Sequence, residues 1–269
     1  TTPALQPMRD ARAARTDAAC EEVRRSRPRL LDFVYGTHAR ERIDIYPTDD
    51  DFAPLVVFIH GGYWKSRSKD QFAYLAPTFV DRGMNFAAVG YPLAPEARLS
   101  DIVASCRKAI HWLLNYPSGL RFDPNRVHVI GHSAGGHLAA MMMATDWTRF
   151  ALPAGAVKSA TCVSGLYDLA PLRLVRQLRE LRIDAEEARA LSPARLRPPA
   201  KGRLIATVGG EETAEFRRHT AELIGAWKRA GLRVAAPAAR GLHHFNVLDA
   251  LTDPKAALHK TVLSTIRAV

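Results

Sequence analysis

The stretch VHVIGHSAGGHLAAMMMAT, residues 127–145, decides the fold of this chain. Its first four residues have the β-branched, mostly apolar character of a buried strand. From Ala134 onward the stretch is rich in Ala, Leu and Met, which favours a helix. Between the two, Ser133 lies at a sharp turn with glycine on either side, at Gly131 and Gly135. A strand, a tight turn and a helix in this order present a serine hydroxyl at the edge of a sheet, as a nucleophilic serine requires.

Glycine is required at both positions of this turn, because side chains at Gly131 and Gly135 are expected to collide with neighbouring backbone. The helix that follows directs its positive N-terminal end towards the serine hydroxyl. A GxSxG pattern alone is weak evidence, since three fixed positions recur by chance. Its place between a predicted strand and a predicted helix favours a catalytic role for Ser133.

Strands and helices alternate on both sides of this unit. Two segments near the start alternate apolar and polar residues and predict antiparallel strands, and later segments alternate strand with helix. This order predicts an α/β fold with a mostly parallel central sheet and helices on both of its faces. The predicted strands are residues 30–35, 42–46, 55–59, 85–90, 126–130, 158–163, 203–208 and 233–236. The predicted helices are residues 8–25, 70–82 with a kink at Pro77, 100–114, 134–145, 214–230 and 247–268.

A length of 269 residues fits one large α/β domain, and we expect residues 1–269 to form a single unit. Residues 169–199 are the one long connection between predicted elements. Apolar residues recur there at Leu172, Val175, Leu178 and Leu181, which predicts a small helix over the site. We expect this insertion to be a minor cap and not a second domain.

The composition restricts partners and compartment. The net charge is +11, but no nucleic-acid-binding signature accompanies the arginines, so we expect solvated helix faces and no nucleic acid partner. No apolar run reaches the roughly 20 residues of a membrane span, and no apolar leader region follows the first residues. Three cysteines without paired spacing indicate reduced thiols in the cytoplasm. The oligomeric state is open, a homodimer included.

A second chemical signal is HGGYW, residues 60–64, at the end of a predicted buried strand. Attack on a carbonyl builds negative charge on its oxygen, and losing one backbone N–H donor to that oxygen typically costs about 3 kcal/mol. Glycines let the backbone approach a substrate closely. We expect an oxyanion hole made of three backbone amides, those of Gly62, Tyr63 and Ala134, with Gly61 in the substrate pocket.

The general base is expected late in the chain, because this kind of fold orders nucleophile, acid and histidine. His219 and His259 fall within predicted helices and are expected at the surface. His243 and His244 follow the last predicted strand, and His244 is favoured because Phe245 can anchor its loop in the core.

The acid that orients the imidazole is not decided by pattern. Glu211 and Glu212 follow the strand at 203–208, and Asp168 follows the strand at 158–163, so any of the three carboxylates is a candidate. No HExxH or clustered ligand set, no GxGxxG and no P-loop occurs, so no metal and no cofactor is expected.

Several motifs together resemble one known group. They are HGGYW at residues 60–64, GHSAGGHL at 131–138, SGLYDLAPL at 164–172, LSP at 191–193, GGEETAEF at 209–216 and HHF at 243–245. In this combination the chain resembles the kynurenine formamidase (arylformamidase) branch of the α/β hydrolases, close to esterases. The resemblance implies the α/β-hydrolase fold, Glu212 as the acid, where many relatives have Asp, and His244 as the base. Tyr63 stands where the esterases have a third glycine.

The residues and the resemblance together predict a serine hydrolase that works through an acyl-enzyme. Its expected substrate is a small aryl formamide or an aryl or short-acyl ester, with N-formylkynurenine, giving kynurenine and formate, as the best single candidate. An aromatic pocket wall is expected from Tyr63, Trp64, Tyr167 and Phe245. The alternatives are a general short-chain carboxylesterase and, from another class, a non-catalytic small-molecule receptor on the same fold.

Overall fold

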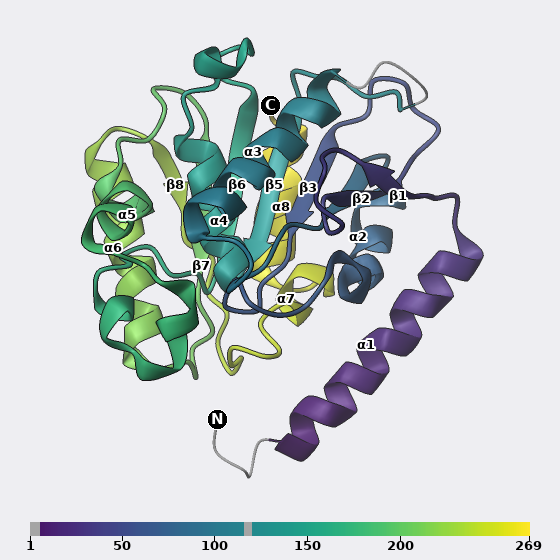
Figure 1. Cartoon of the computed structure of the whole chain (residues 1–269). Helices are drawn as coiled ribbons and strands as arrows, with labels where there is room; N and C mark the ends of the chain where they lie inside the picture. Colours follow the sequence, from purple (N-terminus) through teal and green to yellow (C-terminus); the bar gives the residue numbers. More distant parts are fainter. Residues whose placement is uncertain (1–5, 116–119) are drawn as a thin grey trace.

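A twisted sheet of eight strands runs through the centre of the molecule (Figure 1). The computed structural model describes residues 6–115 and 120–269. The strand order is β1-β2-β4-β3-β5-β6-β7-β8; β1 and β2 pair antiparallel, β2 and β4 pair antiparallel, and all other neighbours are parallel. The mostly parallel sheet is therefore confirmed. Its strands are β1 (Leu30–Val34), β2 (Arg42–Tyr46), β3 (Leu55–Ile59), β4 (Asn85–Val89), β5 (Val127–His132), β6 (Val157–Val163), β7 (Arg203–Thr207) and β8 (Arg233–Ala235).

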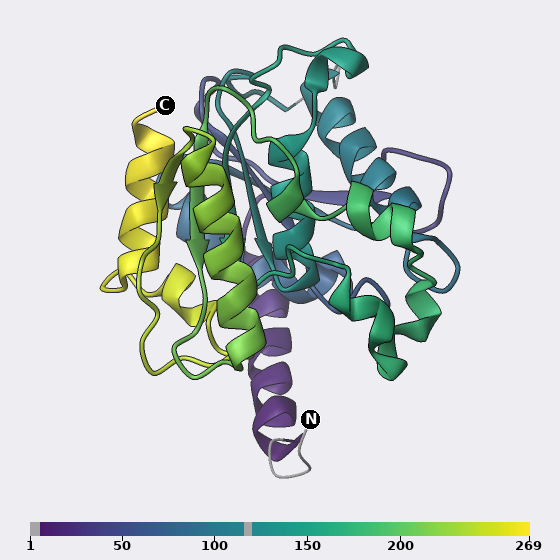
Figure 2. The same cartoon turned by 90° about the vertical axis from the view of Figure 1, so that its left-hand side faces the viewer.

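Helices cover both faces of the sheet, as predicted, and Figure 2 shows the two layers on either side of it. One face carries α3 (Leu99–Asn115), α4 (Ala134–Ala144) and α6 (Ala214–Arg229). The other carries α1 (Gln6–Ser26), the 3₁₀ helix η2 (Lys69–Leu75), α2 (Ala76–Val80), α7 (Asp249–Thr252) and α8 (Ala257–Arg267).

The central strand β3 explains why both faces need a cover. All five of its residues are buried, and successive side chains point to opposite faces of the sheet. Leu55, Val57 and Ile59 belong to the core beneath α3 and α4, whereas Val56 and Phe58 belong to the core beneath α2 and α8. An apolar strand of this kind loses free energy if either face meets water, at about 25 cal/mol per Å² of apolar surface.

Two predicted helices, the first expected to kink at Pro77 and the second expected to be continuous, are each divided in two near a proline. The predicted helix at 70–82 is split into η2 and α2, and Pro77 lies in the first turn of α2, where its missing N–H costs no hydrogen bond. The predicted closing helix at 247–268 is split into α7 and α8 by residues 253–256, which include Pro254. The expectation of one closing helix is therefore wrong.

The segment at 169–199 is not one helix but a series of short turns. It contains the 3₁₀ helices η4 (Pro171–Leu174), η5 (Arg176–Leu181) and η6 (Pro193–Arg195), with α5 (Ala185–Ala190) between them. Leu172, Leu178 and Leu181 are buried, whereas Val175 is 36% exposed. Three of the four apolar positions thus anchor the segment, although their spacing does not produce a regular helix.

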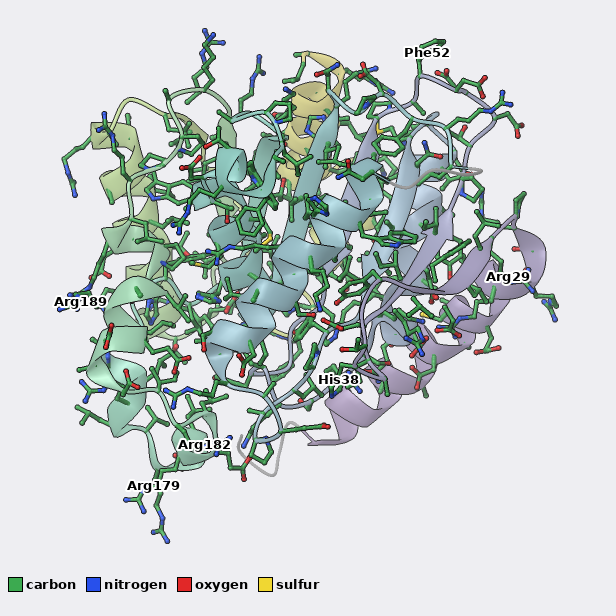
Figure 3. All side chains as sticks on the ribbon, turned by 45° about the horizontal axis from the view of Figure 1, so that its top comes forward. Arg29, His38, Phe52, Arg179, Arg182 and Arg189 are labelled. Carbon is green, nitrogen blue, oxygen red and sulfur yellow. The ribbon has the colours of Figure 1, made fainter. Side chains whose placement is uncertain are left out.

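Helix α1 extends away from the body of the molecule (Figure 1). Near its C-terminal end Cys20 and Val23 are buried against η2, and Arg27 forms an ion pair with Asp81. Other arginines point outward into solvent, among them Arg29, Arg179 and Arg189 (Figure 3). Among the helices that the structure describes, none is both long and apolar enough to cross a membrane.

Candidate active site

The site assembles at the carboxyl ends of the central parallel strands. Ile59 of β3 lies beside Gly131 of β5, and Val163 of β6 lies beside both His132 of β5 and Thr207 of β7. The loops that follow these strands therefore leave the sheet at one edge, where open α/β sheets bind their ligands.

Ser133 occupies the turn between β5 and α4 in a backbone conformation that non-glycine residues rarely adopt, with φ 57° and ψ −123°. Its side chain is almost buried, and the residue is 4% exposed. A Cβ on Gly131 would lie 1.9 Å from the carbonyl oxygen of Gly135, and a Cβ on Gly135 would lie 2.0 Å from that of Ile59. The steric reason inferred for both glycines therefore agrees with the structure.

Three side chains from distant parts of the chain meet at this turn. His244 Nε2 lies 3.0 Å from Ser133 Oγ, and His244 Nδ1 lies 2.7 Å from Glu212 Oε2. Since a carboxylate can only accept, Nδ1 donates to Glu212, and Nε2 is left as the acceptor for the serine hydroxyl. The geometry is that of a nucleophile, a base and an acid.

The rival candidates lie elsewhere. Glu211 is exposed, and its backbone amide donates to the carbonyl of Leu242. Asp168 forms an ion pair with Arg195 at 3.1 Å. The ring of His243 is occupied locally, because its Nδ1 accepts a hydrogen bond from the amide of Phe245. The structure therefore brings Glu212 and His244, and none of these three, to Ser133.

Glu212 is held through both of its carboxylate oxygens. Its side chain is fully buried, and Oε2 faces His244 while Oε1 accepts hydrogen bonds from the amide of Gly209, at 2.9 Å, and from the hydroxyl of Ser164. Sequence reasoning missed Ser164. The signal was present, since this serine directly follows β6 just as Ser133 directly follows β5.

The loop that carries His244 is anchored from two sides. Nε2 of His132 donates to the carbonyl of His244 at 3.0 Å, which ties the loop to the residue next to the nucleophile. The ring of Phe216, from α6, lies 4.3 Å from the imidazole of His244, and that of Phe245 lies edge-on at 5.6 Å. His132 and Phe216 were also missed, because only the folded chain brings them to the base.

The loop after β3 turns so tightly that three consecutive residues have positive φ: Gly62 (113°), Tyr63 (51°) and Trp64 (57°). The carbonyl of Gly62 accepts from the amides of Lys65 and Ser66, which closes the turn. Within the described part of the chain, no hydrogen bond uses the amides of Gly62, Tyr63 or Ala134. Their use as an oxyanion hole beside Ser133 stays a prediction.

His60 supports this loop from below. Its Nδ1 donates to the carbonyl of Gly61 at 2.7 Å, its ring stacks on Tyr91, and the Tyr91 hydroxyl donates to the His60 carbonyl. Burial lowers the pKa of His60 to about 3, so the ring is neutral. Gly61 itself is buried against the nucleophile, since a Cβ there would lie 3.0 Å from Ser133 Cβ.

The expected aromatic wall is only partly present. Tyr63 is 38% exposed and Phe245 is half-buried, so both can face a ligand. Burial raises the pKa of Tyr63, and the charge of Glu212 raises it further. Trp64 and Tyr167 have no exposed surface; Trp64 packs edge-on against His137, and the Tyr167 hydroxyl accepts from the amide of Gly165. These two residues support the loops and do not form a pocket wall.

The expectation that His219 and His259 lie at the surface is wrong. His219 is 2% exposed, and its Nδ1 accepts from the amides of Tyr167 and Asp168, while His259 is 4% exposed and donates to the carbonyl of Leu251. Both histidines form hydrogen bonds with backbone groups far from their own helical turn, and a helical sequence pattern does not reveal such contacts.

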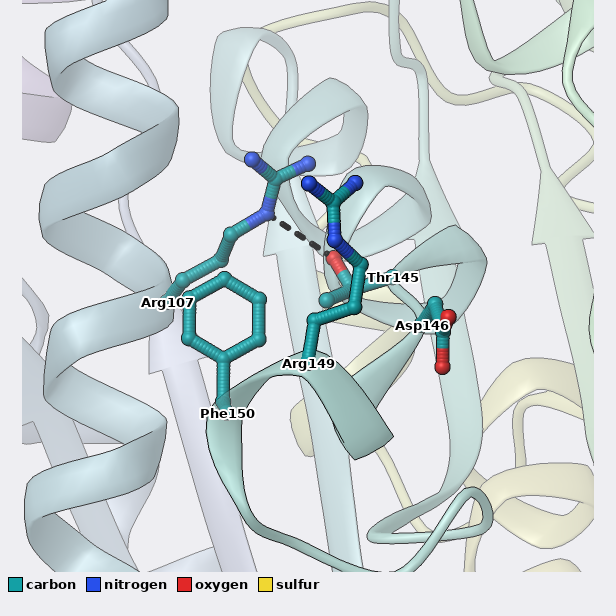
Figure 4. A pocket seen from close by; sticks show the side chains of 5 residues that line it. All are labelled: Arg107, Thr145, Asp146, Arg149 and Phe150. Atoms are coloured by element: carbon teal, nitrogen blue, oxygen red, sulfur yellow. Dashed lines mark hydrogen bonds between the residues drawn. The ribbon is translucent and has the colours of Figure 1, made fainter.

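A cavity of about 360 Å³ lies away from the triad (Figure 4). It is lined by Arg107, Thr145, Asp146, Arg149 and Phe150, and Arg107 Nε donates to the hydroxyl of Thr145. It contains none of the site residues. In residues 6–115 and 120–269, no group of three or more His, Cys, Asp or Glu side chains is placed to hold a metal ion.

Comparison with known proteins gives matches over nearly the whole chain. The BD-FAE family model matches residues 43–162. Proteins named kynurenine formamidase are 32% identical in both Danio rerio (244 residues, 88% of this chain and 82% of the relative) and Salmo salar (232 residues, 83% and 77%). A crystal structure from Silicibacter sp. TM1040, provisionally named a thioesterase, is 28% identical with a TM-score of 0.81, over 94% of this chain and 92% of that one.

The matches to these two relatives span 88% and 83% of this chain, so they extend well beyond the local motifs. The eight-stranded sheet has the architecture of the α/β hydrolases. The chain belongs to the kynurenine formamidase family of α/β hydrolases and is a hydrolase.

Proposed function

We propose that this protein is a serine hydrolase that cleaves an aryl formamide, with N-formylkynurenine as substrate and kynurenine and formate as products. The observation that carries the proposal is the continuous set of contacts from Ser133 Oγ through the His244 ring to Glu212 Oε2, at 3.0 and 2.7 Å. Relatives named kynurenine formamidase support the choice of substrate.

In the first half of the reaction, Ser133 Oγ attacks the formyl carbon while its proton passes to His244 Nε2. The carbonyl oxygen becomes an oxyanion, which the amides of Gly62, Tyr63 and Ala134 stabilise. His244 then gives the proton to the departing aryl nitrogen, the C–N bond breaks, and the arylamine leaves a formyl ester on the serine. Glu212 stabilises the imidazolium that forms between these two transfers.

In the second half, His244 takes a proton from a water molecule, which attacks the formyl ester. The same oxyanion hole holds the new tetrahedral intermediate, and the proton returns to Ser133 Oγ as formate leaves. One water is consumed and no redox change occurs. A formyl group carries only hydrogen beyond its carbonyl, which suits a nucleophile that is 4% exposed beside the buried Gly61.

The test is a direct comparison of substrates. The purified protein should turn over N-formylkynurenine with a higher kcat/KM than p-nitrophenyl acetate, measured by the absorbance of each product. Ser133→Ala should lower kcat by at least about 10⁴-fold, since it removes the nucleophile, while the thermal unfolding curve stays close to that of the wild type. Fast cleavage of the ester with hardly any cleavage of the formamide would refute the formamidase assignment.

Ester hydrolysis is the second candidate, and the similarity to a protein provisionally named a thioesterase, at 28% identity, favours it. The same residues would perform it, with an alcohol or thiol as the leaving group. The two candidate activities are ranked by measuring kcat/KM for aryl esters, alkyl esters and thioesters beside the formamide. If Ser133→Ala retained wild-type turnover of every substrate, both candidates would fail.

We extend the proposal to partners and compartment: a small-molecule substrate, no nucleic acid or membrane partner, and a cytoplasmic location. The three cysteines, Cys20, Cys106 and Cys162, are free and buried, as is usual in reducing compartments. A salt-dependent gel shift with DNA or RNA would contradict the absence of a nucleic acid partner.

A further inference from the structure

Ser164 has a backbone conformation that needs a reason. It directly follows β6, has φ 50° and is fully buried. Its amide donates to the carbonyl of Thr207 at 2.8 Å, which holds the residue between the ends of β6 and β7. Positive φ is uncommon and unfavourable for a residue with a Cβ, and glycine adopts it most readily. A serine at such a position therefore suggests that its hydroxyl has a use.

The Ser164 hydroxyl donates a hydrogen bond to Oε1 of Glu212. The amide of Gly209 donates to the same oxygen at 2.9 Å, whereas Oε2 is left to His244 Nδ1 at 2.7 Å. The two oxygens of the carboxylate thus have separate partners: one is held by the protein scaffold and the other faces the base.

The carboxylate depends on these donors. The side chain of Glu212 is fully buried, and a buried carboxylate is stable only if it is paired and hydrogen-bonded. Arg217, the nearby arginine with a hydrogen bond to Glu212, donates to its backbone carbonyl and not to its carboxylate. Glutamate also has one more rotatable bond than aspartate, so Oε1 must be held for Oε2 to stay in front of the imidazole.

We propose that Ser164 is a positioning residue for the hydrolytic reaction: its hydroxyl fixes the Glu212 carboxylate so that Oε2 orients His244 and stabilises the imidazolium. This inference rests on the proposed function only in requiring that Ser133, His244 and Glu212 catalyse hydrolysis. It does not depend on whether the substrate is a formamide or an ester.

The experiment compares Ser164→Ala and Ser164→Gly with the wild type. Both variants remove the hydroxyl, and the glycine variant also suits the positive φ, so it remains folded if the alanine variant does not. We expect kcat/KM to fall about 10- to 100-fold in both, the range for losing a hydrogen bond to a charged group. Ser159→Ala is the matched control, because Ser159 is a buried serine of β6 whose hydroxyl contacts His128 and no site residue. It should keep wild-type activity.

Two readouts separate positioning from a general loss of structure. The acid limb of the kcat/KM profile should move to lower pH in both Ser164 variants, because the imidazolium is less well stabilised. Among the described residues, the titratable or charged groups around the pair include His132, Tyr63, Tyr167 and Arg217, and these variants leave them unchanged. In a Glu212→Gln background, Ser164→Ala should have almost no further effect, since the carboxylate it positions is already gone.

Wild-type kcat/KM and an unshifted acid limb in Ser164→Gly would overturn the proposal, as would full additivity with Glu212→Gln. Rates are compared on the substrate that the wild type cleaves faster, N-formylkynurenine or p-nitrophenyl acetate. Rejection of the formamide alone therefore refutes the proposed substrate and leaves this test intact. If neither is cleaved, the rate at which a fluorophosphonate labels Ser133 gives the same comparison.

Discussion

Ser133 is held at φ 57° by the backbone on each side of it, not by its own preference. The hydroxyl reaches His244 only because the chain turns within a few residues from β5 into α4. The turn requires glycine at Gly131 and Gly135, because a Cβ at either position would meet a backbone carbonyl oxygen, which cannot move aside as a flexible side chain can. Local strain at the nucleophile is thus maintained by close packing around it.

Gly135→Ala tests this packing. Its Cβ would lie 2.0 Å from the carbonyl oxygen of Ile59, so β3 and α4 must separate. We expect the free energy of unfolding, measured by urea denaturation, to fall by about 3 kcal/mol or more, and activity to be lost with it. Gly155→Ala is the control, because a Cβ there meets only the end of the Lys158 side chain, at 3.7 Å. Similar stability of the two variants would contradict the steric account.

At the scale of elements, α5 attaches the segment at 169–199 to the start of α3. Glu187 is almost buried, and its Oε1 accepts from the amide of Ser100 at 2.8 Å, in the first turn of α3. Its Oε2 accepts from Arg98 at 3.1 Å. First-turn amides have no acceptor within their own helix, so Glu187 supplies one from another element and also meets the positive end of α3.

Glu187→Ala should therefore weaken the attachment of α5 to α3. We expect a loss of about 1–3 kcal/mol in the free energy of unfolding, mainly from the Ser100 amide left without its acceptor. The exposed pair with Arg98 should contribute little. Glu186→Ala, at the adjacent exposed position, should change the free energy by less than about 0.5 kcal/mol. Equal effects of the two variants in urea denaturation would show that α5 is not held in this way.

At the scale of the whole molecule, three of the buried histidines have strongly lowered pKa values and are neutral in the folded chain. Burial lowers the pKa of His60 and His128 to about 3 and that of His137 to about 4, from an ordinary value of 6.5. Below pH 6.5 these histidines become protonated in the unfolded chain but stay neutral in the folded chain. The contribution of these histidines to the free energy of unfolding is therefore fully present above about pH 6.5. It is lost as the pH falls towards 4, by about 1.4 kcal/mol per pH unit for each histidine.

The measurement is the urea unfolding free energy of the wild type and of His128→Asn between pH 7 and pH 4. Asparagine can keep the hydrogen bond to Ser159 but does not titrate. The variant should lose stability less steeply on acidification, by about 1.4 kcal/mol per pH unit. Carboxylates contribute equally to both proteins and cancel. Parallel slopes would mean that His128 is not a source of the acid sensitivity.

The order of residues over short stretches of the sequence determined the secondary structure and the two tight turns of this protein. Alternating strand and helix patterns predicted the sheet, and GHSAG between a strand and a helix predicted the elbow at Ser133. Both are decided by residues close in sequence, whose backbone preferences and side-chain periodicity act over a few residues. The HGGYW loop belongs to the same class, because glycines and positive φ produce its turn locally.

Only the tertiary structure decided which groups meet. Glu211, Glu212 and Asp168 are equivalent as pattern, and Glu212 is distinguished by its contact with a ring 32 positions later in the chain. Ser133 and His244 are 111 positions apart, and Ser164 reaches Glu212 across 48. Likewise, Trp64 and Tyr167 are fully buried in the core. A hydrogen bond requires two atoms about 3 Å apart, and for such pairs the distance is determined by the packing of the whole sheet rather than by neighbouring residues.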